Sequence, residues 1–201
     1  MPKKTGIAII AVGAALILSA LLLLLYNRYE DAHAGQEAES LLASVEEAIS
    51  AQTMDVPTAA APSPTPLDPE MPVVMLDGYE YVGYVEIPAL GLKLPVISEW
   101  SDAKLKKAPC RYSGSAYLKN MIIAGHNYRT HFSGIKRLNP GDSVVFTDAD
   151  GNVFSYEVAE IETVGGYDIE KMEAGDWDLT LFTCTNKGKA RAAVRCREIE
   201  E

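Results

Sequence analysis

A segment of twenty uncharged residues, from Gly6 to Leu25, limits what this chain can fold into more than any other feature. An α-helix of that length spans about 30 Å, which matches the hydrocarbon core of a lipid bilayer. So long and uniformly apolar a segment is unsuited to be the core helix of a small domain. The sequence therefore predicts a transmembrane helix over residues 6–26.

Charged residues on either side of this segment indicate its orientation. Lys3 and Lys4 lie in the preceding tail, residues 1–5, whereas Arg28, just after the helix, is followed by two acidic residues. The positive-inside rule places the tail in the cytoplasm and everything after the helix on the extracellular face. We therefore expect a protein of the cell membrane that crosses it once.

A cleaved signal peptide is the alternative interpretation of the same segment. Ala32-His33-Ala34 resembles the small-residue site at which signal peptides are cut. However, the apolar stretch is longer than a typical signal core, and charged residues crowd the space before the cut. These two properties favour an uncleaved anchor.

Two further segments separate the predicted anchor from the rest of the chain. Residues 27–52 have the pattern of a polar helix, which either packs on the folded domain or forms an extracellular stalk. The narrow apolar stripe of this helix consists of Leu41, Leu42, Val45 and Ile49. Residues 53–72 contain six of the eleven prolines, which predicts an extended linker.

The folded domain is expected over residues 73–201, and its composition argues against one large class of functions. The whole chain has a net charge of −10, but nine of its 28 acidic residues precede residue 73, so the domain is only mildly acidic. A nucleic-acid-binding domain would need a basic surface. Three cysteines are too few for a disulfide-stapled scaffold, and an odd number outside the cell leaves at least one free thiol.

Short apolar runs separated by turn residues recur through the domain. Candidate strands lie at 85–87, 92–94, 121–124, 143–146, 153–158, 179–183 and 191–197. Asp150-Gly151 predicts a hairpin turn between two of them. Short helical pieces fit only residues 134–138 and parts of 100–107 and 168–173. This pattern predicts an all-β domain, either a closed barrel or a sandwich.

Cys184 is the first candidate for chemistry, because it ends the run Thr180-Leu181-Phe182-Thr183-Cys184 and so lies at the last position of a predicted strand. A thiol there is at the rim of the fold, where it meets substrate while the strand fixes its position. A buried structural cysteine is the alternative, and it is the commoner fate of a free cysteine.

His126 also follows a predicted buried strand, directly after Gly125, whose missing side chain permits close approach of backbone or ligand. Histidine is the usual proton shuttle near neutral pH, and a loop histidine that only forms local hydrogen bonds is the alternative. His131 is a weaker candidate in a polar loop. The spacing of the two histidines does not fit a helical metal pair, and we predict no metal site.

Arg191 opens the last predicted strand, after a short turn that contains Gly188. A two-stranded hairpin returns it to the side of Cys184, where a guanidinium stabilises the negative charge of a tetrahedral intermediate or holds substrate carbonyls. Arg195 has the same strand parity and is the main rival for this role. A surface arginine on an edge strand is the alternative without chemistry.

Taken together, these residues resemble the sortase family. The motifs of that family are a TLxTC nucleophile strand, an upstream Gly-His and an arginine on the next strand. The matching strings are Gly83-Tyr84-Val85-Glu86-Ile87-Pro88, Ala124-Gly125-His126-Asn127 and Thr180-Leu181-Phe182-Thr183-Cys184, followed by Arg191. They occur in the order that sortases have, the resemblance covers about residues 80–200, and the N-terminal anchor also fits.

The resemblance implies an eight-stranded β-barrel with short helices and a cysteine transpeptidase that uses no cofactor. Cys184 would attack the threonine carbonyl of a C-terminal LPxTG-type sorting signal on a secreted protein, which forms a thioester acyl-enzyme. His126 would protonate the leaving amine and later deprotonate the incoming one. Arg191 would support the oxyanion and position the signal, and Thr183 would line the substrate groove.

The implied partners are secreted proteins with a sorting signal and an amine acceptor, which is a lipid-linked cell-wall precursor or a pilin lysine, outside a Gram-positive cell. No second hydrophobic segment follows Cys184, which argues against the doubly anchored pilin-polymerase type. The segment 165–177 is short, so members with a long helical insertion there fit poorly. Calcium activation would need a carboxylate cluster, for which Glu99 and Asp102 are loose candidates.

Two alternative functions stay open at this point. The same residues would serve a hydrolytic cysteine protease whose acceptor is water, and an anchored β-domain would bind wall components without catalysis.

The pairing of the other two cysteines is also open. Cys196 is expected to face the core by strand parity with Val194, whereas Cys110 lies in a loop-like stretch. A disulfide between these two cysteines is conceivable in an exported protein.

Overall fold

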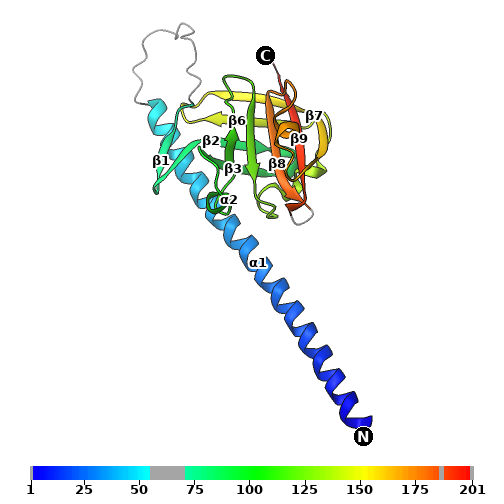
Figure 1. Ribbon diagram of the computed structural model, residues 1–201. Coiled ribbons are helices and arrows are strands. Elements are labelled where there is room, and N and C mark those ends of the chain that lie inside the picture. Colours follow the sequence, from blue (N-terminus) through cyan, green and yellow to red (C-terminus); the bar gives the residue numbers. More distant parts are fainter. Residues whose placement is uncertain (1, 55–70, 186–187, 200–201) are drawn as a thin grey trace, which may run out of the picture. The chain divides into compact units, whose positions relative to one another are not determined.

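The computed structural model describes residues 2–54, 71–185 and 188–199 (Figure 1). The predicted linker 53–72 therefore lies almost entirely outside the described residues. The chain divides into two compact units, Met1–His33 and Ala34–Glu201. Secondary structure in the first unit is a single helical segment, and the second unit holds the strands.

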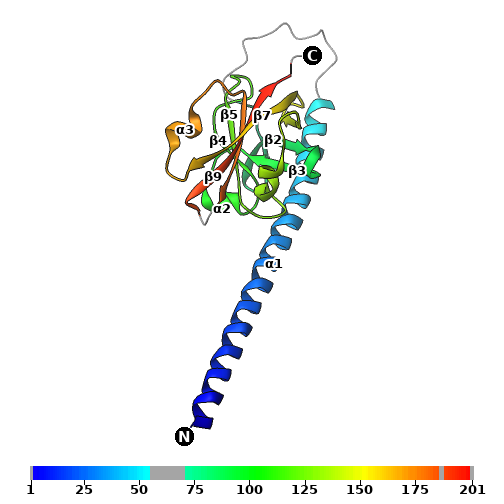
Figure 2. The same ribbon diagram turned by 90° about the vertical axis from the view of Figure 1, so that its right-hand side faces the viewer.

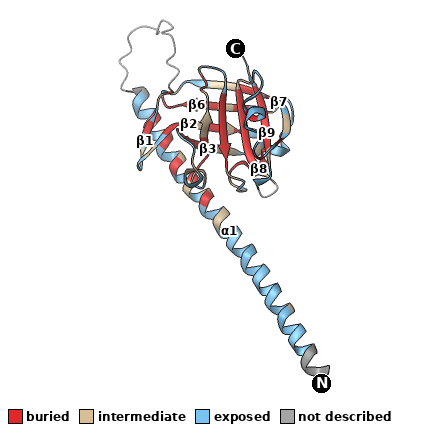
Figure 3. Ribbon diagram, viewed as in Figure 1, coloured by how far each residue is buried: buried red, intermediate tan, exposed pale blue. Residues whose placement is uncertain are grey.

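Helix α1 extends from Pro2 to Met54 and begins in the first unit, where its apolar side chains are exposed (Figure 3). Within the described residues, the segment Gly6–Gln52 is long and apolar enough to cross a membrane, by length and composition. The predicted N-terminal apolar helix is confirmed. Its role as an anchor stays a prediction.

The part of α1 that belongs to the second unit lays one face on the strands. Its buried positions recur at helical spacing, and they are Ala34, Ala38, Leu41, Val45 and Ile49. The last three share an apolar cluster with Tyr81 and Ile97. At the edge of the cluster, Glu46 forms an ion pair of 2.7 Å with Lys93. The apolar stripe therefore packs on the domain instead of forming a free stalk.

The described part of the domain contains nine strands. They are β1 (Val74–Leu76), β2 (Tyr79–Ile87), β3 (Leu92–Ile97), β4 (Cys110–Ser113), β5 (Met121–Gly125), β6 (Ser143–Asp148), β7 (Val153–Gly165), β8 (Leu179–Thr185) and β9 (Ala190–Glu198). Their order in the sheet is β1-β2-β3-β4-β5-β8-β9-β7-β6, and a further pairing joins β2 to β6. This last pairing closes β2–β9 into an eight-stranded barrel, so the closed barrel is confirmed and the sandwich is excluded.

Alternating side chains fill the inside of this barrel. Val85, Ile123, Phe146, Leu181 and Val194 come from five different strands, belong to one cluster and are fully buried. Figure 3 shows the strands mostly in the colour of buried residues. Burial of alternate positions on strands from both halves of the domain holds the barrel closed and fixes the register of each strand.

Short helices connect several strands, as the sequence predicts. They are η1 (Pro88–Leu90), α2 (Asp102–Leu105), η2 (Phe132–Arg137) and α3 (Ile169–Glu173). The predicted Asp150-Gly151 hairpin is also present between β6 and β7, with Gly151 at a φ of 84°. The Asp148 carboxylate accepts hydrogen bonds from the backbone N–H groups of Asp150 and Asn152, which fixes this turn.

Several stretches differ from the prediction, since β1 was not predicted and β2 begins at Tyr79, before the predicted start at residue 85. The residues around Cys110, expected as a loop, form strand β4, which pairs with β5 and touches β3 only through Ile97 and Cys110. Such a short strand has too few residues to show a period of two. Strand β7 continues to Gly165, well beyond the predicted end at residue 158, because β9 pairs with it as far as Ala190.

The three cysteines, all of which are described, are free thiols. Cys196 faces the barrel interior, as its strand parity predicts. Cys110 instead belongs to the cluster under α1. The conceivable disulfide between them is therefore not formed in the structure.

Candidate active site

Two parallel strands bring the predicted thiol and imidazole to one edge of the barrel. In the β5–β8 pair, Gly125 lies opposite Thr183. The next residues along the two strands are His126 and Cys184, and neighbouring strands are about 4.8 Å apart. Because parallel strands end at the same edge, two residues that are 58 positions apart in the sequence lie side by side.

Cys184 and His126 both line one hollow of about 290 Å³. Cys184 is exposed and His126 is half-buried. The remaining lining residues are Asp102, Leu105 and Lys106 from the α2 region, with Gly125 and Asn127 beside the histidine. The thiol therefore faces an open space that it shares with the imidazole.

The loop after β5 fixes the position of His126. The backbone carbonyl of His126 accepts a hydrogen bond of 3.1 Å from the N–H of Phe132, which closes the loop into a tight turn. A Cβ at Gly125 would approach the Phe132 ring to 2.3 Å, so only glycine fits before the histidine. The imidazole stacks on the Tyr128 ring, with 3.9 Å between the ring centres.

Arg191 is the cross-strand partner of Cys184 in the β8–β9 pair. Its guanidinium lies 5.1 Å from the centre of the Phe182 ring, which supports the charge through a cation–π contact. Its Nε and Nη1 atoms are buried and find no acceptor among the described residues. These N–H groups are hydrogen-bond donors on the strand beside the thiol, although Arg191 is not among the residues that line the hollow.

Arg195, the rival arginine, has a different place. It is 1% exposed and donates hydrogen bonds to the Glu162 carboxylate, the Thr180 hydroxyl and the Met172 carbonyl. These contacts fasten α3 to the outer face of the barrel, where Figure 2 shows that helix. Neither arginine lines the Cys184 hollow, but only Arg191 is the cross-strand partner of Cys184, whereas Arg195 is that of Thr180.

Thr183 was expected to line the groove, but its side chain is 1% exposed. Its hydroxyl donates a hydrogen bond of 2.8 Å to the Gly125 carbonyl. It is not among the residues around the hollow. The side chain thus joins the two strands that end at the thiol and at the imidazole.

The other candidates from the sequence are dispersed. His131 is fully buried and lies edge-on to Tyr128, 5.4 Å between ring centres. Of the two loose calcium candidates, Glu99 forms an ion pair with Lys104, whereas Asp102 lines the hollow. No group of three or more histidines, cysteines, aspartates or glutamates that would suit a metal ion occurs in the described part of the chain.

A buried apolar cluster lies beside the thiol, on the outer face of the barrel. It is a cluster of Ile122, Ala124, Val164, Met172, Phe182 and Ala193, with Leu105 and Tyr112 packed against it. The Tyr112 ring packs edge-on against two other rings, with 5.4 Å between ring centres for Phe182 and 5.9 Å for Trp100. Trp100 is 44% exposed, so this aromatic row reaches solvent.

Sequence reasoning missed Leu105, Lys106 and Asn127 as residues of the hollow. Asn127 directly follows His126 in the sequence, so its position next to a predicted site residue could have identified it. Leu105 and Lys106 gave none, because the fold alone brings the α2 region to the edge where β5 and β8 end.

Burial separates Cys184 from the other two thiols. Burial raises the pKa of the Cys110 thiol and of the Cys196 thiol, in each case to about 12. Both therefore stay protonated at physiological pH, and a protonated thiol is a poor nucleophile. Cys184 is the exposed thiol of the chain.

Comparison with known proteins identifies the family to which this closed eight-stranded barrel belongs. The sequence model of the sortase domain matches residues 85–199, which is more than half of the chain. The chain belongs to the sortase family.

Individual relatives agree with this. Sortase A of Bacillus anthracis is 30% identical over 123 residues, and the match spans 55% of each protein, so this chain covers about half the length of that relative. Sortase C1 of Streptococcus agalactiae is 26% identical in structure-based alignment, with a TM-score of 0.55 over 63% of this chain and 72% of that chain. Sortase C of Clostridium perfringens, solved with the C-terminal cell wall sorting motif, shares the fold at 22% identity, with a TM-score of 0.54 over 83% and 91%.

Proposed function

We propose that this protein is a membrane-anchored cysteine transpeptidase that cleaves a C-terminal LPxTG-like sorting signal and transfers the protein to an amine. The observation that carries the proposal is that the exposed Cys184 and His126 line the same hollow, with Arg191 opposite Cys184 on the neighbouring strand. Family membership supports the same chemistry.

In the first half-reaction, the Cys184 thiol gives its proton to His126, and the sulfur forms a bond to the threonine carbonyl carbon of the signal. The bond between that carbon and the following amide nitrogen breaks, and His126 passes the proton to the departing nitrogen. The product is a thioester acyl-enzyme. The position of His126 at the wall of the same hollow suits this proton transfer.

In the second half-reaction, an amine nitrogen attacks the thioester carbon. His126 takes a proton from this nitrogen, a new amide bond forms, and the bond to sulfur breaks, which restores the thiol. Each half-reaction passes through a tetrahedral carbon that carries an oxyanion. The buried Nε and Nη1 donors of Arg191 can stabilise that charge or hold the carbonyls of the signal.

The donor substrate is proposed to be a secreted protein with a sorting signal. The structure of Clostridium perfringens sortase C was solved with the C-terminal cell wall sorting motif, which supports this class of ligand for the family. Leu105, which lines the hollow beside Cys184, offers an apolar contact for the apolar residues of such a signal. The acceptor is proposed to be a cell-wall precursor or a pilin.

The anchor suits this reaction. We propose that residues 1–5 are cytoplasmic, 6–26 cross the membrane, 27–52 and 53–72 extend outside it, and 73–201 form the catalytic domain. The exposed apolar side chains of the helix in the first unit support a position in lipid. Substrates exported across the membrane would then meet the thiol on the extracellular face.

The test uses the full chain in detergent micelles with an LPxTG-type peptide, with and without an added amine. Mass spectrometry should detect an acyl-enzyme on Cys184, and the added amine should convert the peptide into a transfer product. Cys184→Ala should abolish both species and retain the native thermal unfolding midpoint. Product from hydrolysis alone, at a saturating amine concentration, would instead support the protease.

A missing acyl-enzyme across a panel of sorting-signal peptides would support the non-catalytic wall-binding domain. Arg195→Lys is a matched control for Arg191→Lys in this assay. We expect the substitution at residue 191 to slow acyl-enzyme formation by about 100-fold, the usual effect of losing one oxyanion donor. The control should act mainly on stability, because Arg195 is bonded to α3 and lies opposite Thr180, not opposite Cys184.

A further inference from the structure

A second hollow, of about 460 Å³, lies next to the one that holds Cys184. Asn127, the residue after His126, lines both. The other residues around the second hollow are Arg129, Ser133, Gly134, Lys136 and Arg137, from the loop after β5 and from η2. The proposed transpeptidase mechanism uses none of these side chains.

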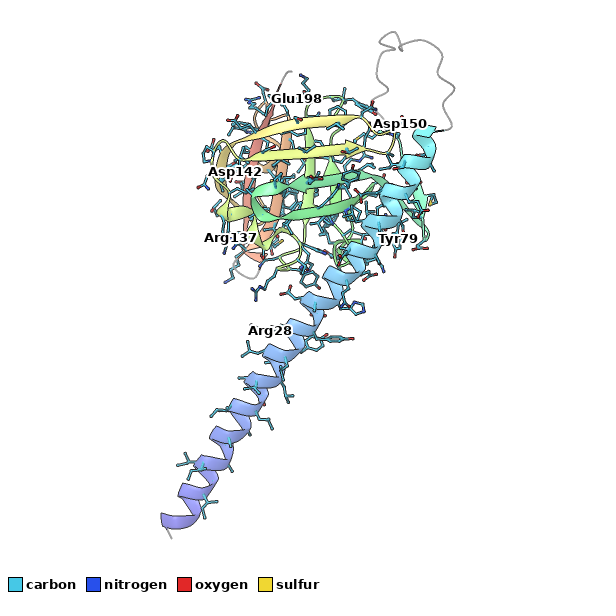
Figure 4. All side chains as sticks on the ribbon, turned by 180° about the vertical axis from the view of Figure 1, so that it is seen from behind. Arg28, Tyr79, Arg137, Asp142, Asp150 and Glu198 are labelled. Carbon is cyan, nitrogen blue, oxygen red and sulfur yellow. The ribbon has the colours of Figure 1, made fainter. Side chains whose placement is uncertain are left out.

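The charge of this hollow is opposite to that of the chain. Three of its lining residues are cationic and none is acidic, whereas the whole chain has a net charge of −10. Lys136 and Arg137 are exposed, and Figure 4 shows Arg137 at the end of the barrel away from Glu198. Ser133 and Asn127 add neutral hydrogen-bonding groups. A hollow of this kind is complementary to an anion.

Gly134 leaves space for this arrangement. A Cβ at this position would lie 3.0 Å from Arg137 Nη2. The guanidinium therefore lies over Gly134, which also lines the hollow. A planar guanidinium forms paired hydrogen bonds to carboxylate and phosphate oxygens, and the neighbouring lysine adds a point charge.

We propose that this basic hollow binds an anionic group, a carboxylate or a phosphate, carried by the amine acceptor. The inference rests on the proposed transpeptidase function. The donor signal has to reach Cys184 in the first hollow, which meets the second hollow at Asn127. The acceptor amine has to reach His126, and a group attached to that amine enters the second hollow past Asn127. The anion forms no covalent bond there.

The experiment compares acceptors that differ only in charge, with the full chain and a sorting-signal peptide as donor. Oligoglycines of increasing length are paired with their C-terminal amides, and O-phosphoethanolamine is paired with ethanolamine. We expect the carboxylate or the phosphate to raise kcat/KM about three- to fivefold over the neutral match, the scale of exposed ion pairs. Added salt should lower this preference.

The diagnostic variant is Lys136→Gln/Arg137→Gln. Its matched control is Lys119→Gln/Arg197→Gln, which removes the same two charges but lies elsewhere, since Lys119 pairs with Glu198 and Arg197 stacks on Trp177. The diagnostic variant should lose the preference for charged acceptors, and its hydrolysis rate without amine should be unchanged. The control should retain the preference. An equal kcat/KM for charged and neutral acceptors in the unsubstituted protein overturns the proposal.

A binding measurement separates this proposal from the proposed function. Inorganic diphosphate is titrated into the protein while the amide NMR signals of Asn127, Ser133 and Gly134 are followed. Saturable shifts should occur in the unsubstituted protein and in the control, and disappear in the diagnostic variant. Absence of saturable shifts overturns the anion site even when peptide is cleaved. Diphosphate binding without any acceptor preference overturns the assignment to the acceptor.

Discussion

The hydroxyl of Thr183 donates a hydrogen bond of 2.8 Å to the carbonyl oxygen of Gly125. This bond joins the residue before Cys184 to the residue before His126, across the parallel strands β8 and β5. Thr183 is 1% exposed, so water does not compete for the bond. The hydroxyl therefore fixes the separation of the thiol and the imidazole without touching the hollow.

Thr183→Val should misalign the two groups while preserving side-chain shape. We predict that the rate of acyl-enzyme formation falls about tenfold, because small displacements of a catalytic pair are costly. The free energy of unfolding should decrease by about 1 kcal/mol, the value of one hydrogen bond. Single-turnover mass spectrometry and urea denaturation measure the two effects.

Thr183→Ser is the control for that substitution, because it retains the hydroxyl. We expect Thr183→Ser to restore most of the rate. If Thr183→Val reacts as fast as the unsubstituted protein and loses only stability, the hydroxyl is structural and does not position the pair.

The reactivity of the thiols gives a second prediction. In the folded protein, iodoacetamide at neutral pH should alkylate Cys184 alone, because burial raises the pKa of Cys110 and of Cys196 to about 12. In denaturant without a reducing agent, all three cysteines should react, since none is in a disulfide. Peptide mapping counts the modified thiols, and only one reactive thiol in denaturant would mean that Cys110 and Cys196 form a disulfide.

The strand ends could be predicted because short local patterns encode them. The runs before His126 and Cys184 are apolar, and Gly188 signals the turn that returns Arg191 to the thiol. The closed barrel, however, depends on the pairing of β2 with β6, whose residues Gly83 and Asp148 are far apart in the sequence. No local sequence periodicity indicates such a long-range pairing. The choice of a closed barrel over a sandwich therefore came from the family resemblance.

The two arginines of β9 illustrate what strand parity does and does not determine. Arg191 and Arg195 are on the same face, as their spacing predicts. Their register separates them, since Arg191 lies opposite Cys184 and Arg195 lies opposite Thr180. The prediction that Thr183 lines the substrate groove meets a different limit. A position inside a sequence motif does not tell whether a side chain faces substrate or the neighbouring strand.

The buried Arg195 gives a third prediction, through Glu162. Burial acts to raise the pKa of the Glu162 carboxyl, but hydrogen bonds from Arg195 and Lys171 outweigh it, so the pKa lies below its ordinary 4.5. A carboxyl with a lowered pKa in the folded state stabilises the protein fully above pH 4.5. That contribution is lost as the pH falls through the folded pKa.

Glu162→Gln should therefore lower the free energy of unfolding by about 1–2 kcal/mol at pH 7. The difference from the unsubstituted protein should shrink below pH 4.5, where the carboxyl of the unfolded chain becomes protonated, and should vanish below the lower pKa of the folded state. Urea denaturation at several pH values measures this. Exposed Glu160 in the same strand provides the control Glu160→Gln, for which we expect little change. A pH-independent difference for Glu162→Gln would contradict the ion-pair explanation.

The contact between α1 and the barrel gives the last prediction. Val45 is fully buried in the cluster with Tyr81 and Ile97, whereas Ala43 on the same helix is exposed. Val45→Asp would bury a charge without a partner, so the helix should detach from the strands. We expect the thermal unfolding midpoint of the domain to fall by about 5–10 °C, which corresponds to a loss of a few kcal/mol. Ala43→Asp places the same charge in solvent and should leave the midpoint within about 1 °C. Equal midpoints for the two variants would mean that the apolar stripe of α1 does not stabilise the barrel.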